Sequence, residues 1–130
     1  MNIERIDPPG LRRPPTYAPV VRVTGGRTVY LSGQVPVDLD GNVAEDDFVA
    51  QAKQVYENLR LALAGVGADF HNLVRMTTYI VDFSDERRAL LSTVRAEAMG
   101  DVRAASTLLG VQSLAMPSYL LEVEGIAVVE

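Results

Sequence analysis

Residues 120–129, Leu-Leu-Glu-Val-Glu-Gly-Ile-Ala-Val-Val, decide the fold because they predict a β-strand that is apolar on both faces. One face carries Leu121, Val123, Gly125, Ala127 and Val129. The other face carries Leu120, Ile126 and Val128 beside Glu122 and Glu124. A strand of this kind needs cover on both sides of its sheet. We expect helices on one side and another subunit on the other.

Two helices are predicted upstream of this strand. Apolar residues recur at intervals of three and four from Asp46 to about Val66, which indicates a helix with one buried stripe. A second helix is expected to begin at Ser84 or Asp85 and to end at Gly100. The two segments are the only helices that the sequence predicts, so they can cover one face of a sheet and no more.

The remaining segments predict β-strands and one extended lead-in. Gly25-Gly26 separates the β-forming residues 20–23 from residues 28–31, and two glycines suit the positive φ angles of a tight hairpin turn. Residues 7–19 hold five of the seven prolines, which predicts an extended, turn-rich segment. Further strands are expected at 74–81, about 105–111 and about 119–129.

These elements follow the order β-β-α-β-α-β-β and form a single domain over residues 1–130. No linker or internal repeat divides the chain. Two helices on one face of a sheet place the fold in the α+β class.

The composition narrows the classes of function. The net charge is −5, with 12 basic and 17 acidic residues, which argues against a nucleic-acid partner. There is no cysteine and one histidine, His71, so neither a disulfide nor a metal site is expected. No stretch approaches the ~18 apolar residues of a membrane span, and no signal-peptide core is present. We expect a soluble, cytoplasmic protein that acts on a small-molecule metabolite and has no membrane partner.

Two carboxylates on the final strand are candidates for acid–base chemistry. Glu122 and Glu124 are two residues apart, so they share one face with Cα atoms roughly 7 Å apart. A carboxyl group in an apolar setting has a raised pKa and can act as a general base near neutral pH. The alternative is that this end of the strand is exposed to solvent and that both acids are ordinary surface charges.

Segments spread over nearly the whole chain match one known pattern. They are Tyr17 and residues 31–36, 54–59, 77–82, 105–107 and 121–128. The most specific are Ser32-Gly33-Gln34 and the Glu-x-Glu-x-Ile-Ala sequence of residues 122–127. Taken in this order, the segments resemble the Rid family (RidA, also called YjgF).

The resemblance implies a chorismate-mutase-like fold, which is a mixed sheet with two helices packed on one face. It also implies a homotrimer in which three copies surround a central barrel and form three clefts between subunits. The best-known activity of the family is hydrolysis of reactive enamines and imines to a keto acid and ammonia, as an enamine/imine deaminase. Neither a cofactor nor a metal takes part.

The resemblance further implies roles for individual residues. Glu122 is expected to hold the attacking water, and Thr107 is the second residue expected to be catalytic. The residues at the expected substrate-binding positions are Tyr17, Ser32, Gly33, Ala105 and Ser106. Strand spacing, rather than the resemblance, adds Arg103, two residues before Ala105.

Two departures from the family pattern bear on the substrate. Family members with demonstrated deaminase activity have an arginine before the Ser-Thr or Ser-Cys pair, where it binds the substrate carboxylate, and here that residue is Ala105. They also tend to have an asparagine in the second helix, where this chain has Ala89-Leu90-Leu91. Arg103 is a candidate replacement, because residues two apart in an extended chain project on the same side. The alternative is a solvated Arg103, and we expect a cleft that is less positive than that of an active deaminase.

Three functions remain open at this point. The first is hydrolysis of an enamine or imine with an altered substrate, and the second is a non-catalytic trimer that binds a small ligand in the same clefts. The third is the endoribonuclease activity (endoribonuclease L-PSP) for which some relatives are labelled. The pI of 4.8, the single histidine and the single lysine all argue against the third.

Overall fold

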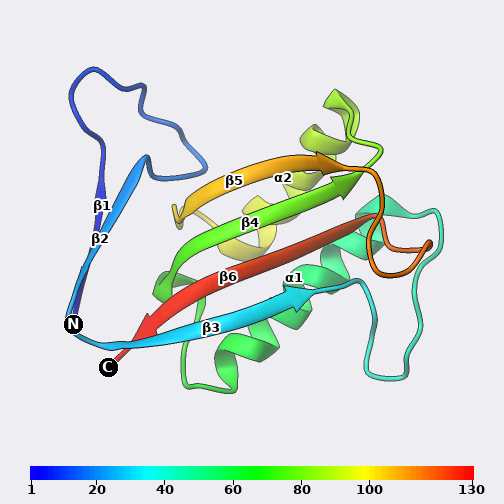
Figure 1. The fold of residues 1–130 in the computed structure, drawn as a ribbon, viewed down its shortest axis with the longest axis horizontal. Coiled ribbons are helices and arrows are strands. Elements are labelled where there is room, and N and C mark those ends of the chain that lie inside the picture. Colours follow the sequence, from blue (N-terminus) through cyan, green and yellow to red (C-terminus); the bar gives the residue numbers. More distant parts are fainter.

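The computed structural model describes residues 1–130 and contains a four-stranded sheet with two helices on one face (Figure 1). The strands lie in the order β3 (Arg27–Gln34), β6 (Leu121–Val129), β4 (Leu73–Val81) and β5 (Ala105–Val111). β6 is antiparallel to both β3 and β4, whereas β5 is parallel to β4. The predicted α+β class, with a mixed sheet and two helices on one face, is therefore confirmed.

Both helices begin at residues whose side chains cap the first turn. In α1 (Phe48–Ala64), the carboxylate of Asp47 accepts a hydrogen bond from the backbone N–H of Ala50 at 3.0 Å. In α2 (Asp85–Met99), the hydroxyl of Ser84 accepts one from the N–H of Arg87. Gly100 ends α2 with a φ of 61°. Short-range signals thus place the helices within two residues of their predicted ends. A short 3-10 helix, η1 (Phe70–Asn72), precedes β4.

The core lies between the helices and the covered face of the sheet. Val55 and Leu59 of α1 and Leu121 and Val123 of β6 are all fully buried. β4 contributes alternate residues, because successive side chains of a strand point to opposite faces, except at its start. There the pairing with β6 shifts between residues 73 and 75, so that Leu73 is buried and Val74 is not. The shift is the two-against-one pairing of a β-bulge.

The predicted hairpin between residues 20–23 and 28–31 does not form. β2 (Val20–Thr24) pairs with β1 (Asn2–Ile6), a strand that the sequence analysis did not predict, and the two make a separate sheet. Gly25 and Gly26 do turn the chain, with φ angles of 73° and 82°, but the turn carries β2 away from β3 (Figure 1).

Residues 2–24, here called the N-terminal arm, are held by contacts with residues distant in the sequence. No local turn motif predicts these contacts. The guanidinium of Arg5 donates to the carbonyls of His71 at 2.8 Å and of Arg103 at 2.9 Å. The N–H of Ala18 donates to the carbonyl of Ala104 at 3.1 Å. The hairpin prediction was wrong because tertiary contacts, rather than the local turn, select the strand partner.

The second face of the sheet, here called the open face, has no helix over it (Figure 1). Tyr30 on β3 is 78% exposed and Leu109 on β5 is 42% exposed. Exposed apolar surface of this kind marks an interaction site in many proteins. The open face therefore stays available for the predicted contact between subunits. No helix of the structure combines the length and the apolar character needed to cross a membrane.

Candidate functional site

A β-bulge at Ser32 and Gly33 shapes the centre of the candidate site. Leu31 pairs with Gly125 and Gln34 pairs with Val123, so three steps along β3 oppose two steps along β6. The extra residue of a bulge has no partner in the ladder, and bulges are frequent beside active sites. The Ser-Gly-Gln segment of the sequence therefore corresponds to a real interruption of the sheet.

Glu122 lies directly against this bulge. A methyl group added at Gly33 would stand 2.8 Å from Cδ of Glu122, so the carboxyl group fills the space that a larger residue would occupy. Burial, and secondarily the neighbouring charge of Glu124, raises the pKa of Glu122 above the usual range of a glutamate. Glu122 thus has the environment of a general base, and the structure brings it together with Ser32 and Gly33.

Glu124 is held differently, although it shares the face of Glu122. The phenol of Tyr79, on β4, donates a hydrogen bond to Oε1 of Glu124. That hydrogen bond is the main cause of a raised pKa for Tyr79. The two acids therefore differ in their contacts: the carboxylate of Glu124 accepts a hydrogen bond from Tyr79, whereas that of Glu122 lies against the bulge.

Thr107 lies on the open face together with an arginine that the sequence analysis did not select. Nη2 of Arg75 donates to Oγ1 of Thr107 at 2.7 Å. Arg75 is also the direct register partner of Ala105 on the parallel strand β5. Strand alternation makes Arg75 the only cationic side chain on the open face of the four strands. Alternation in residues 74–81 places Arg75 on this face, but the sequence does not reveal its register with Ala105.

A hollow of about 400 Å³ marks this part of the open face. Its lining includes Ser32 from β3, Arg75 and Thr77 from β4, and Glu124 from β6. These residues supply hydroxyl groups, a carboxylate and a guanidinium, which are the groups that orient a small polar ligand.

The structure places Arg103 away from this hollow. Its guanidinium donates to both carboxylate oxygens of Asp7, with Nη1 at 3.0 Å, and Nε donates to the carbonyl of Tyr17 at 3.1 Å. The side chain is 12% exposed, and the hydrogen bonds to Asp7 raise its pKa further. Arg103 is therefore neither solvated nor free, and its donors already hold the N-terminal arm to the start of β5.

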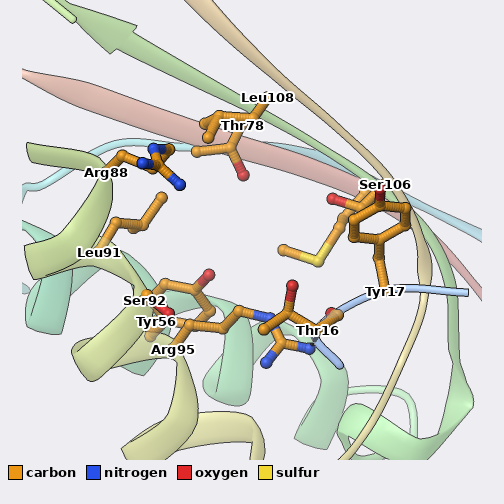
Figure 2. Close-up of a pocket in the computed structure, with 11 residues that line it drawn as sticks. Thr16, Tyr17, Tyr56, Thr78, Arg88, Leu91, Ser92, Arg95, Ser106 and Leu108 are labelled. Atoms are coloured by element: carbon orange, nitrogen blue, oxygen red, sulfur yellow. Dashed lines mark hydrogen bonds between the residues drawn. The ribbon is translucent and has the colours of Figure 1, made fainter. Parts of the chain in front are cut away.

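Tyr17 and Ser106 lie on the other side of the sheet. They line a pocket of about 390 Å³ between α2 and β5, here called the helix-side pocket (Figure 2). Successive residues of a strand face opposite sides, so Ser106 points toward this pocket while Ala105 and Thr107 point toward the open face. Within one chain the expected site residues thus form two groups on opposite faces.

This chain is similar in sequence and in structure to members of one protein family. The family described as endoribonuclease L-PSP matches residues 11–129. A solved structure of YyfB from Yersinia pestis, described as a Rid family protein of unknown function, superposes with a TM-score of 0.91 at 33% identity. That superposition covers 99% of this chain and 100% of YyfB.

Two curated relatives match over a shorter region. Protein DfrA of Myxococcus xanthus is 41% identical over 73 residues, which is 55% of this chain and 56% of DfrA. The 2-iminobutanoate/2-iminopropanoate deaminase of Salmonella typhimurium is 33% identical over 73 residues, which is 55% of this chain and 57% of the relative. The chain thus matches a little over half the length of each of these two proteins.

Proposed function

Because this chain belongs to the Rid family, described also as endoribonuclease L-PSP, we propose that it hydrolyses a reactive enamine or imine to a carbonyl compound and ammonia. The observation that carries the proposal is Glu122, a carboxyl group with a raised pKa set against the Ser32–Gly33 bulge. The similarity to an iminobutanoate deaminase supports the same class of reaction.

In the proposed reaction Glu122 accepts a proton from water while the water oxygen bonds to the imine carbon. Glu122 then returns that proton to the nitrogen, which gives a carbinolamine and restores the carboxylate. A second proton then moves from the new hydroxyl to the nitrogen, the C–N bond breaks and ammonia leaves. The carbon remains as a carbonyl group, so one water is consumed for each ammonia released. The backbone at Ser32 and Gly33 and the hydroxyl of Thr107 are the groups proposed to position the reactants.

Glu122 and Thr107 are too far apart to contact one small substrate within a single chain. β4 lies between Thr107 on β5 and Glu122 on β6, which separates them by about 10 Å across the sheet. In the register of the sheet, Thr107 pairs with Thr77 and Thr77 pairs with Glu124. Glu122 lies two residues farther along β6, which adds roughly 7 Å along the strands. A small imine cannot contact both, so we propose that one subunit supplies Glu122 and the next supplies Thr107.

The direct test is a coupled assay with imines generated in the cuvette by an oxidase, from an amine as well as from an amino acid, because Ala105 leaves a substrate carboxylate without the arginine of active deaminases. Faster release of ammonia in the presence of the protein supports the hydrolase. A protein that binds the product carbonyl compound but never accelerates its release is instead a non-catalytic binding trimer, an alternative that Ala105 favours. The endoribonuclease alternative predicts RNA binding that weakens with salt, and the net charge of −5 argues against it.

A homotrimer is the first prediction of this proposal. The open face exposes apolar side chains on β3 and β5, and their burial favours association. Light scattering coupled to size exclusion is expected to give about three times 14.1 kDa. A stable monomer at micromolar concentration would contradict both the assembly and the site between subunits.

A second prediction concerns the carboxylate of the substrate. Ala105→Arg is expected to raise kcat/KM for amino-acid-derived imines about 10- to 100-fold, because a hydrogen bond from arginine to a carboxylate contributes roughly 1.5–3 kcal/mol. Steady-state kinetics on the wild type and the variant measure the change. Rapid wild-type turnover that is lost in Arg75→Gln would contradict this prediction and would identify Arg75 as the group that binds the carboxylate.

A further inference from the structure

Tyr79 of β4 lies beside both carboxylates of the open face but binds only one of them. In the register of the sheet Tyr79 pairs with Glu122, whereas Glu124 pairs with Thr77. The phenol nevertheless donates its hydrogen bond across the diagonal, to Oε1 of Glu124. Diagonal neighbours on one face of an antiparallel pair have Cα atoms about 7–8 Å apart, which an aromatic side chain can span. Tyr79 therefore binds the diagonal acid and leaves its direct neighbour, Glu122, unbound.

This hydrogen bond fixes the position of the Glu124 carboxylate. It is the main cause of the raised pKa of Tyr79, followed by burial and by the charges of Glu124 and Glu122. The phenol therefore keeps its proton at physiological pH and remains a donor. A hydrogen bond from a neutral donor to a carboxylate is roughly twice as strong as one between neutral groups. The side chain of Glu124 is thus attached to β4 and does not turn along β6 toward Glu122.

The other ionisable groups on the open face do not take this role. Arg75, on β4, donates to the hydroxyl of Thr107. Tyr30, on β3, pairs with Ile126 rather than with either acid. The open-face residues of β5 carry no ionisable group. Tyr79 is thus the group on this face that hydrogen-bonds one of the two acids.

Without this hydrogen bond the two acids could meet. Glu122 and Glu124 are two residues apart on one face of β6, with Cα atoms roughly 7 Å apart. Two carboxyl side chains at this separation can bring their oxygens into contact, and two carboxyl groups in contact share one proton because their like charges repel. A shared proton would occupy the oxygen with which Glu122 accepts a proton from water.

We propose that Tyr79 is a positioning residue for the hydrolysis proposed above, in which its phenol holds Glu124 apart from Glu122 so that Glu122 alone accepts the proton from water. Tyr79 acts through Glu124 and keeps its own proton throughout. The inference rests on the proposed function, since it explains why one of two neighbouring acids is the base.

The first measurement follows the side-chain carboxyl carbon of Glu122 by NMR across a pH titration, in the wild type and in Tyr79→Phe. Phenylalanine keeps the ring and removes only the hydroxyl group. The resonance of Glu122 is identified by its absence in Glu122→Gln. In the wild type it is expected to titrate in one step. In Tyr79→Phe the main step is expected about one pH unit higher, with a second step at lower pH, because the proton then belongs to the pair. Curves that superimpose, or a shift to lower pH alone, would overturn the proposal.

The pH dependence of kcat/KM is the second measurement. The acid limb of Tyr79→Phe is expected to move to higher pH together with the NMR titration, so its activity falls further below the wild type as the pH drops. An activity loss of the same size at every pH would show a merely structural role and would overturn the proposal. Tyr119→Phe removes a phenol from the loop before β6 and is the matched control, expected to leave the titration and the acid limb unchanged.

A double variant tests whether Tyr79 acts through Glu124. Glu124→Gln removes the second acid, so adding Tyr79→Phe to it is expected to cause no further shift of the Glu122 titration to higher pH. A further upward shift as large as in the single variant would show that the phenol acts on Glu122 directly, and would overturn the proposal. The NMR titration needs no turnover. A protein that hydrolyses no imine would therefore contradict the proposed function, while the titration separately decides whether Tyr79 keeps the two acids apart.

Discussion

Glu122→Gln is expected to lower kcat for imine hydrolysis by about 10²–10⁴-fold, which is the usual contribution of a positioned general base. Glutamine keeps the shape of the side chain but does not accept a proton from water. The melting temperature is expected to stay the same or rise slightly, because the raised pKa of Glu122 shows that the folded protein disfavours its charge. Steady-state kinetics and thermal unfolding measure the two effects separately.

The pH profile gives this prediction a second readout. The reaction needs the ionised form of Glu122, so kcat/KM is expected to fall as the pH drops through the pKa of that group. Burial and Glu124 raise this pKa, so the acid limb lies above the usual range of a glutamate, and it is expected to disappear in Glu122→Gln. Glu57→Gln, at an exposed position on α1, is the matched control and is expected to leave the profile unchanged.

If Glu122→Gln turns over the imine as fast as the wild type, Glu122 is not the base. Glu124 does not easily replace it, because its carboxylate accepts a hydrogen bond from Tyr79. Loss of activity in Glu124→Gln with full activity in Glu122→Gln would nevertheless transfer the role to Glu124.

Gly33→Ala is expected to reduce activity by about 10²-fold or more, although it adds a single methyl group. That methyl group would lie 2.8 Å from Cδ of Glu122, so the carboxyl group has to move. A displacement of about 1 Å at a catalytic group costs a factor of this size. Crowding is also expected to lower the free energy of unfolding by about 1–3 kcal/mol.

A double variant separates the contact from other effects of the substitution. Gly33 does not have a positive φ, so alanine is compatible with the backbone there. If the collision with Glu122 causes the loss of stability, Gly33→Ala combined with Glu122→Ala is expected to regain the melting temperature without regaining activity. A double variant that is less stable than either single variant would show that the methyl group disturbs the bulge in another way.

The sequence was a good guide to the face of each strand and a poor guide to its neighbours. Alternation in residues 120–129 predicted which side chains of β6 share a face, and Leu121, Val123 and Ala127 of one face are all fully buried. The same alternation separates Ser106 from Thr107. It did not show that Arg75 lies beside Ala105, because a parallel register joins two segments 30 residues apart.

The sequence by itself determined the helices, most of the strands and the α+β class, since capping residues such as Asp47 and Ser84 and the spacing of apolar residues act over a few neighbouring positions. Only the tertiary structure decided that β2 pairs with β1, that the Ser32–Gly33 bulge meets Glu122 and that Arg103 binds Asp7. Each of these depends on which distant segments come together. That choice is made by burial and hydrogen bonding across the whole chain, and no local pattern contains it.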